Sequence, residues 1–359
     1  MGDRLKAAAT SAAVLALTSG VAHAQWGGVY SGPPKAGPAR PYSAATLAAP
    51  ELLKRIRRDD LHGFRKVVIP FFQVEFDTAS RAESNRAYAS VSSAYDLRGL
   101  SRADMQEMTE ALYARFVSDL QAQGFEVIGL AEARAKSPSL NKLFDTAQPT
   151  PYERKTNGGS VSTFVTPASV PIYFHQGDPE LGGMSGFGSR AHWNQPAAAK
   201  ELGAALIGAR FAVGFVDQHA NDRAFLGLRS STARVNSNVD LSVTPVSTHL
   251  WAITPAARTG IVGQPIEPVR FVLNNALVLS DGPITSVSDT TTGSMKRGDA
   301  VAGAIGALGV LAGASGGFNS KTRAHTVFVD PARYKADVGA ALAGVESRFV
   351  QTLKAEMGS

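Results

Sequence analysis

The chain has 359 residues, of which 44% are hydrophobic, and it contains no cysteine. This hydrophobic content is ordinary for a chain that buries a core, and the lack of cysteine excludes disulfides, thiol chemistry and an acylated N-terminal cysteine. Asp3, Arg4 and Lys6 contribute +1 to the formal net charge of +6. The remaining positive charge allows attraction to anionic lipid or glycan surfaces and does not indicate nucleic acid as a partner.

The first 24 residues have the pattern of a cleaved secretory signal. Arg4 and Lys6 precede an apolar stretch centred on Ala12–Leu17, and Ala22–Ala24 carries small residues at the two positions that signal peptidase reads. A short buried helix is the alternative, but it leaves the A-x-A ending unexplained. We therefore expect cleavage before Gln25 and a periplasmic protein that is not lipid-anchored.

Residues 25–60 are expected to form a linker that ends in a basic segment. Pro and Gly are frequent over 25–50, where no hydrophobic period is present. The cluster KRIRRDD, Lys54–Asp60, is either a solvated helix face or a basic site for phosphate or anionic lipid. A single domain is expected to follow over 61–359.

A strand, a helix and a second strand are predicted at the start of this domain. Lys66–Phe76 is rich in β-branched and aromatic residues, and the strand should bend or end near Pro70, which cannot donate to a ladder. FEVIG, residues 125–129, predicts the second strand. Residues 77–99 are expected to form a long irregular connection.

The intervening helix is predicted from its two ends and its hydrophobic period. Ser101 and Asp104 resemble a capping box, and Gly124 supplies a stop signal. Apolar residues recur at helical spacing between these signals, which predicts one buried face comprising Met105, Met108, Leu112, Phe116 and Leu120.

Residues 137–196 change character, because Gly, Pro, Ser and Asn are frequent and hydrophobic runs are brief. We expect an insertion with one hairpin around SVSTFV (160–165) and VPIYFH (170–175), and a flexible tip at Gly182–Ser189. Its aromatic residues either line a ligand or partner surface or pack locally within a long loop; they are Tyr173, Phe187 and Trp193.

The remaining chain predicts a small helix, a run of strands and a terminal helix. The helix should end at Gly208 and lead into a strand over Arg210–Val216. Alternating stretches over 232–280 indicate consecutive strands joined as a meander. Asp330 and Pro331 begin the terminal helix, whose apolar face comprises Tyr334, Val338, Leu342, Val345, Phe349 and Leu353. The fold class is therefore α/β or α+β, with a mixed sheet flanked by helices.

This order resembles the CsgG-like and TolB-N-terminal-like envelope proteins. The resemblance rests on VVIPFF (67–72), on AQGFEVIG (122–129) after a long helix, and on LGAALIGARFAVGFV (202–216). It covers roughly residues 61–130, 197–290 and 327–355. The resemblance implies an α/β fold and an envelope-associated role; family members include the curli secretion channel and accessory lipoproteins. The missing lipidated cysteine puts channel function in doubt here.

An uncharged stretch, Ala300–Phe318, has no counterpart in this resemblance. Gly309, Gly313 and Gly317 fall four residues apart, a spacing at which two helices can approach closely. We expect a buried or self-associating helical hairpin element in preference to a membrane span or a disordered loop. These three glycines are the predicted packing or self-association residues.

Catalytic and metal-binding motifs are weak. GASGG places Ser315 in a G-x-S-x-G pattern, but only His325 follows, with no acid between them. His175 with Asp178 and Glu180, and His219 with Asp217 and Asp222, lack the paired spacing typical of zinc ligands. We therefore predict no catalytic residue, metal or cofactor.

The sequence favours a non-enzymatic periplasmic scaffold or accessory protein for envelope assembly or secretion. Its expected partners are other envelope proteins or a second copy of itself, with an apolar ligand or a membrane surface as a further contact that the sequence allows. The first alternative is a periplasmic carrier of an apolar or lipid-like ligand, and a serine hydrolase is the less favoured one.

Overall fold

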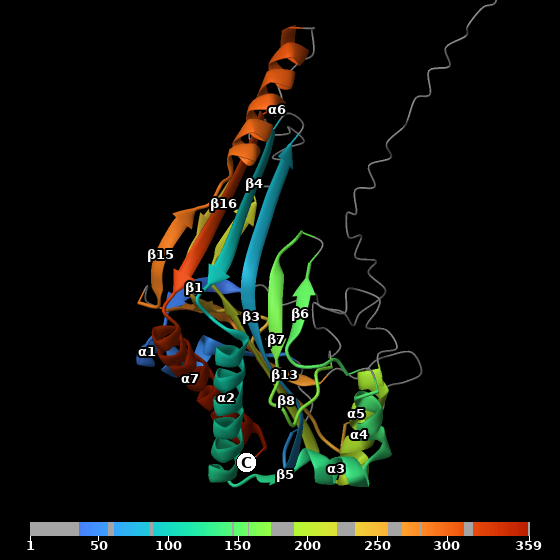
Figure 1. Cartoon of the computed structure of the whole chain (residues 1–359). Coiled ribbons are helices and arrows are strands. Elements are labelled where there is room, and N and C mark those ends of the chain that lie inside the picture. Colours follow the sequence, from blue (N-terminus) through green and yellow to red (C-terminus); the bar gives the residue numbers. More distant parts are fainter. Residues whose placement is uncertain are drawn as a thin grey trace, which may run out of the picture. The chain divides into compact units, whose positions relative to one another are not determined.

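The computed structural model describes residues 36–359, except 57–60, 87–88, 146, 157, 174–189, 221–233, 258–267, 280–281, 312–318 and 358–359. The expected signal segment lies outside the described residues. Residues Lys35–Ser359 form one compact unit. This unit is a mixed α/β fold with a large mixed sheet and flanking helices, as the sequence predicts (Figure 1).

The N-terminal part of this unit is rich in strands before its first long helix. Its elements are β1 Gly37–Pro41, α1 Ala44–Ala48, the 3-10 helix η1 Pro50–Leu52, β2 Leu53–Ile56, β3 Lys66–Arg86, β4 Ala89–Arg98, α2 Arg102–Ala122, β5 Glu126–Ile128, α3 Leu130–Lys136, α4 Pro138–Leu143, β6 Tyr152–Lys155 and β7 Val161–Val165.

The C-terminal part begins with a helix and a run of strands and ends with two helices that are separated by one strand. Its elements are α5 Arg190–Leu202, β8 Ala205–Gly214, β9 Asp217–Ala220, β10 Val235–Asn238, β11 Ser242–Val243, β12 His249–Ile253, β13 Val269–Leu273, β14 Asn275–Val278, β15 Ile284–Asp289, α6 Gly293–Leu311, β16 Asn319–Val329 and α7 Pro331–Met357.

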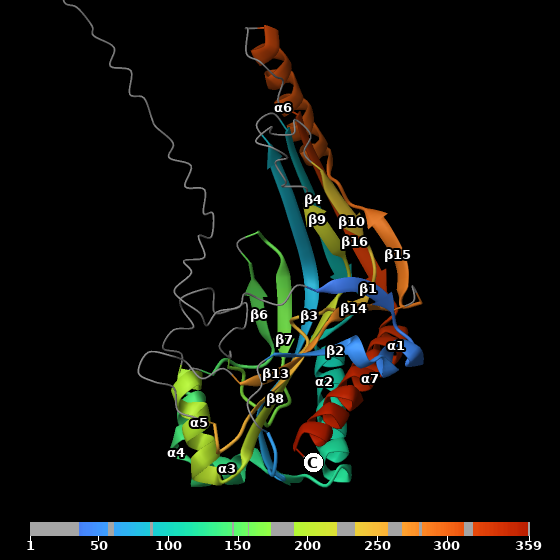
Figure 2. The same cartoon turned by 180° about the vertical axis from the view of Figure 1, so that it is seen from behind.

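The main sheet follows the order β1-β14-β11-β8-β3-β4-β16-β15. Strand β3 lies in its middle and pairs with β8 in parallel, with β4 and β7 antiparallel, and with β5 in parallel. Strands β9 and β10 pair with each other and lie against β3 and β4 (Figure 2). One strand thus connects the buried half of the sheet with the part built by β4 and β16.

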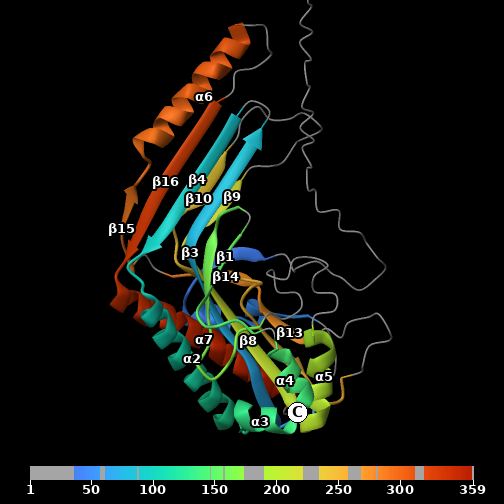
Figure 3. The same cartoon turned by 45° about the vertical axis from the view of Figure 1, so that its right-hand side comes forward.

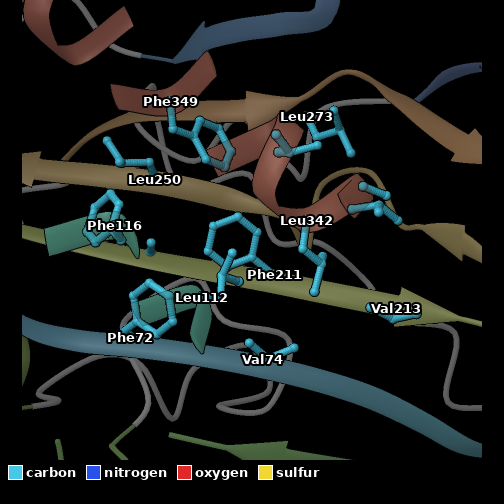
Figure 4. Packing of buried hydrophobic residues seen from close by; sticks show 14 of the residues in the cluster. Phe72, Val74, Leu112, Phe116, Phe211, Val213, Leu250, Leu273, Leu342 and Phe349 are labelled. Atoms are coloured by element: carbon cyan, nitrogen blue, oxygen red, sulfur yellow. The ribbon is translucent and has the colours of Figure 1, made fainter. Parts of the chain in front are cut away.

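Helices α2 and α7 cover one face of the sheet and bury the larger core (Figure 4). The predicted capping box is present, since Asp104 N donates to Ser101 Oγ and Ser101 N donates to Asp104 Oδ2. Gly124 follows the helix with a φ of 86°, which suits glycine. Every residue predicted for the apolar faces of these two helices is buried.

Helices α3, α4 and α5 cover a second core on the other face of the sheet. Phe71, Tyr173 and Trp251 pack there, with the Phe71 ring centroid 5.4 Å from that of Tyr173 and 6.0 Å from that of Trp251. Gly208 of β8 lies directly under the Trp251 indole, because a Cβ at this position would be 2.2 Å from Trp251 Cε2. The absence of a side chain at Gly208 therefore makes room for the indole.

The prediction of an irregular connection over 77–99 is wrong. Strand β3 continues to Arg86, and β4 pairs with it antiparallel from Ala89 to Asp96. Ser, Ala and charged residues dominate this hairpin, so it lacks the hydrophobic alternation that would reveal strands. The expected bend at Pro70 takes the form of a register shift between Val68 and Phe71, after which the strand continues.

The segments expected to be a linker and an insertion also contain regular structure. From Gly37 onward the linker holds β1, α1, η1 and β2, and both strands pair within the main sheet. In the region 137–196, β7 lies where a hairpin strand is expected, but its hairpin partner is β6, and Ile172 instead bridges Gln148. Pairing with distant strands stabilises these short segments, and local sequence does not report it.

The helix expected to end at Gly208 ends earlier. Helix α5 stops at Leu202, and Gly203 follows with a φ of 58°, a left-handed conformation typical of helix C-termini. Strand β8 then begins at Ala205, so Gly208 lies inside it. The strands predicted over 232–280 are confirmed as β10 to β14 for the residues described there. The predicted meander is wrong, because β10 pairs with β9, β11 lies between β8 and β14, and only β12 and β13 pair as consecutive strands.

Gly208→Ala should destabilise the protein, because its methyl group would overlap the buried Trp251 indole. Overpacking of this kind costs about 1–3 kcal/mol, measurable as a lower free energy of unfolding in urea. Gly339→Ala is the matched control, since a Cβ there meets nothing within 4 Å and the site lies within α7. This control should be neutral or stabilising by up to about 1 kcal/mol. Equal effects of the two changes would contradict the packing account.

The contact between α2 and α7 contains a buried carboxylate. The Glu346 side chain is fully buried, and Arg115 Nε lies 3.2 Å from Glu346 Oε2. Arg115 also lies 3.5 Å from Asp119, so one cation is shared between two carboxylates. Burial, and then the negative charge of Asp119, raise the pKa of Glu346 to about 8. The folded state therefore favours protonated Glu346 near neutral pH.

Stability should consequently fall as the pH rises from the ordinary carboxyl pKa of 4.5 toward about 8, because the folded state holds a proton that the unfolded state has released. Glu346→Gln should remove this dependence. We expect the variant to gain at least about 1 kcal/mol relative to the wild type between about pH 5 and pH 9 in urea unfolding. A difference between the two proteins that stays constant with pH would contradict the assignment.

Candidate interaction surface

The sheet ends in a unit that we call the edge module, which comprises β15, α6 and β16. Strand β16 pairs in parallel with the whole of β4, from Asn319↔Ala89 to Phe328↔Arg98. Strand β15 pairs with β16 only over residues 325–329 and ends the sheet. Helix α6 then runs alongside the remaining part of β16 (Figure 3). The edge module therefore has a strand edge at one end and a helix at the other.

The edge module carries all the exposed large hydrophobic residues within the described parts of the chain. Val287 of β15 is 47% exposed, Phe328 of β16 is 40% exposed, and Met295 and Val301 of α6 are 38% and 59% exposed. Isolated surface hydrophobics are normal in soluble proteins, but their confinement to three consecutive elements is informative. This distribution is typical of a surface that contacts another molecule.

Strand β15 also presents an unpaired backbone edge. It pairs with β16 on one side, and among the described residues no strand pairs with its other side. Its residues after Ile284 are all exposed. An edge strand without a cover offers alternating N–H and C=O groups for pairing with another chain. Backbone pairing and the Val287 side chain together could therefore hold a partner strand.

Helix α6 is fixed to β16 by one carboxylate. Asp299 accepts hydrogen bonds from Thr322 N at 2.7 Å and from Ser320 Oγ at 2.9 Å. Desolvation acts to raise the pKa of Asp299, but these bonds and that from Thr322 Oγ1 outweigh it and hold the pKa below its usual value. Asp299 thus satisfies a β16 amide at the point where β15 no longer pairs with it.

Asp299→Ala should free α6 from β16. The Thr322 amide would lose its acceptor, and its hydrogen exchange should become about tenfold faster or more, because amide protection reflects local opening. Hydrogen–deuterium exchange read by mass spectrometry would measure this in peptides covering 319–324. Peptides from α7 serve as an internal control and should be unchanged. Unaltered exchange at Thr322 would contradict the role of Asp299.

The structure brings together few of the residues that the sequence singles out. Gly309 lies in α6, while Gly313, Gly317 and Ser315 fall outside the described residues. Helical packing of the three glycines therefore stays a prediction. His325 stacks on Tyr95 with ring centroids 4.8 Å apart.

The two candidate metal groups fall largely outside the described residues, which include only Asp217 and the backbone of His219. No group of three or more potential metal ligands occurs among the residues that the structure describes. The prediction of no metal site accordingly stays a prediction.

Sequence reasoning missed a buried charged cluster on the middle strands. Arg210 of β8 is 1% exposed and donates to Glu75 of β3 at 2.7 Å, with its guanidinium 5.1 Å from the Phe164 ring centroid. Burial, and then the charge of Glu75, raise the pKa of Asp77, which accepts a hydrogen bond from Ser162. The sequence does contain one signal for this cluster: Gln73, Glu75 and Asp77 alternate with apolar residues, which places three polar side chains on one face of the strand.

Comparison with known proteins gives no match to a family model, to a curated protein or to a solved structure. Among the described helices, none combines the length and apolar character of a membrane-crossing helix.

Proposed function

We propose that the protein is a non-enzymatic scaffold or accessory protein that assembles through the edge module. The observation that carries this proposal is the confinement of exposed large hydrophobic residues to β15, α6 and β16. Val287 lies on the edge strand β15, and Phe328 lies on the neighbouring strand β16 on the opposite face of the sheet, because Val287 is paired with Val327. The unpaired backbone of β15 supplies hydrogen-bonding groups and Val287 supplies apolar area, the two components of strand addition.

The partner that we propose for the β15 edge is a second copy of this chain. Two equivalent β15 edges can pair about a two-fold axis, and each copy then contributes the same exposed Val287. Full burial of an exposed apolar side chain is worth about 1.5–3 kcal/mol, and Val287 is 47% exposed, so each copy gains roughly half of this value. Backbone pairing along the two β15 edges supplies the remaining free energy that offsets the cost of association.

The proposed setting is the bacterial periplasm, in support of envelope assembly or secretion. The secretory pattern of the first 24 residues supports this localisation. The order of β3, α2 and β5, the strand run from β8 to β14, and the terminal helix α7 support a CsgG-like fold. The CsgG-like assignment and the envelope role are parts of the same proposal.

Analytical ultracentrifugation without lipid, over a range of protein concentrations, would test self-association. The wild type should form oligomers, and Val287→Glu should shift it to monomer by at least about tenfold in dissociation constant, because a buried charge replaces an apolar contact. Val301→Glu is the matched control, since it places the same side chain at an exposed apolar site on α6.

A wild type that stays monomeric at every concentration would overturn self-association through β15. A monomer that also carries co-purified lipid would favour the rival function, a periplasmic carrier of an apolar ligand. Equal oligomers in the wild type and in Val287→Glu would show that another surface holds the copies together.

A further inference from the structure

Helix α6 has two chemically different halves. Its first turns carry Lys296, Arg297 and Asp299, whereas no charged residue occurs from Ala300 to its end at Leu311. Ala300, Val301 and Ala304 are exposed, and Val301 is the most exposed large hydrophobic residue described. At 1.5 Å per residue the uncharged half is about 18 Å long, similar to half of a hydrocarbon core that is about 30 Å thick. Water is an unfavourable surrounding for this half of the helix.

Four exposed cations lie close to the start of this uncharged half. Lys296 and Arg297 precede it on α6, and Lys321 and Arg323 lie on β16 in the part that α6 accompanies. None of the four makes a salt bridge to a carboxylate in the described ranges. The carboxylate between them, Asp299, is instead engaged by Ser320 and Thr322. Asp299 and Asp289, which interacts electrostatically with Lys296, offset two of these four positive charges, so the charge offered to a partner here is net positive.

The composition of α6 makes it a weak helix in water. After its first residue, Gly293, the helix holds four more glycines, Gly298, Gly303, Gly306 and Gly309, and glycine is a poor helix former in water. In a bilayer the balance changes, because a helix satisfies its own backbone groups where no water is present to do so. An uncharged helical segment with lysine and arginine near its start suits the surface of an anionic leaflet. The cations can contact lipid phosphate while the apolar side chains enter the acyl region.

From these observations we propose that α6 docks on an anionic lipid leaflet. The uncharged half of α6 enters the leaflet, and Lys296, Arg297, Lys321 and Arg323 contact the headgroups. Helix α6 and the start of β16 lie at the end of the sheet remote from α2 and α7, so these helices do not obstruct this approach (Figures 1 and 3). This contact goes beyond self-association, which uses the β15 edge.

Co-sedimentation of the purified protein with vesicles tests this inference. Vesicles of phosphatidylglycerol mixed with phosphatidylcholine should bind the wild type about tenfold or more better than vesicles of phosphatidylcholine alone, and added salt should weaken this binding. Val301→Glu should lower partitioning into the mixed vesicles by about tenfold or more, because a charge replaces an inserted apolar group. The double variant Lys296→Glu with Arg297→Glu should lower it to a similar extent.

Two controls separate this contact from other effects. Arg65→Glu with Lys200→Glu makes the same change in net charge at exposed positions outside the edge module and should retain most of the binding. Val287→Glu should bind vesicles like the wild type even where it prevents self-association. Circular dichroism should show that Val301→Glu remains folded, as expected for an exposed site, and Met295→Glu provides a second variant if it does not.

Equal binding to both vesicle types, or equal loss in the two charge-reversed double variants, would overturn the lipid contact. Loss of self-association in Val301→Glu with vesicle binding intact would also overturn it, because α6 would then be a protein contact. Since the ultracentrifugation experiment contains no lipid, failure of either proposal leaves the other open to its own test.

Discussion

The parallel pairing of β3 with β8 forms the middle of the sheet, which is buried between two helical layers. Both hydrophobic cores and the extension of the sheet to β16 depend on this pair of strands. On one face, Phe72 and Phe211 meet with ring centroids 5.7 Å apart beneath α2 and α7. On the other face, Gly208 admits the Trp251 indole, so that α5 and its neighbours can close over the second core. Because β3 continues unbroken to Arg86, the rigidity of this buried half extends into the polar hairpin with β4 and from there to β16. The edge module is thus held by a strand whose other half lies in the core.

The edge module differs from the rest of the unit in the chemical character of its exposed groups. Elsewhere, charged side chains pair across elements, as Arg55 does with Glu356 and Arg81 with Asp96. In the edge module, apolar side chains are exposed, and the backbone edge of β15 has no described strand beside it. Exposed apolar side chains that gather on consecutive elements are typical of a surface that a partner covers. Pairing between copies at β15 and lipid contact at α6 would cover different parts of this surface, so the two contacts are compatible.

The sequence predicts the helical layers far better than the outer strands. The α2 capping box and the spacing of apolar residues on α7 are local signals, and both helices occur where these signals place them. The β3–β4 hairpin was missed because Ser80, Ala82 and Ser84 carry no hydrophobic alternation, although the backbone pairs throughout. The sequence indicates the uncharged helix of the edge module. It does not indicate the exposure of Val287 or the Asp299 contact, because both depend on pairing between segments more than twenty residues apart. Sequence patterns report local propensity, and these features arise from tertiary pairing.

The central claim is that β15 is the edge through which copies of the chain meet. Hydrogen–deuterium exchange, compared between dilute and concentrated protein in the absence of lipid, tests this claim most directly, because paired edge amides exchange more slowly than exposed ones. The account predicts that concentration slows exchange in Ile284–Asp289, while β1 at the opposite end of the sheet is unchanged. Exchange in β15 that is independent of concentration, or protection that arises at β1 instead, would contradict it.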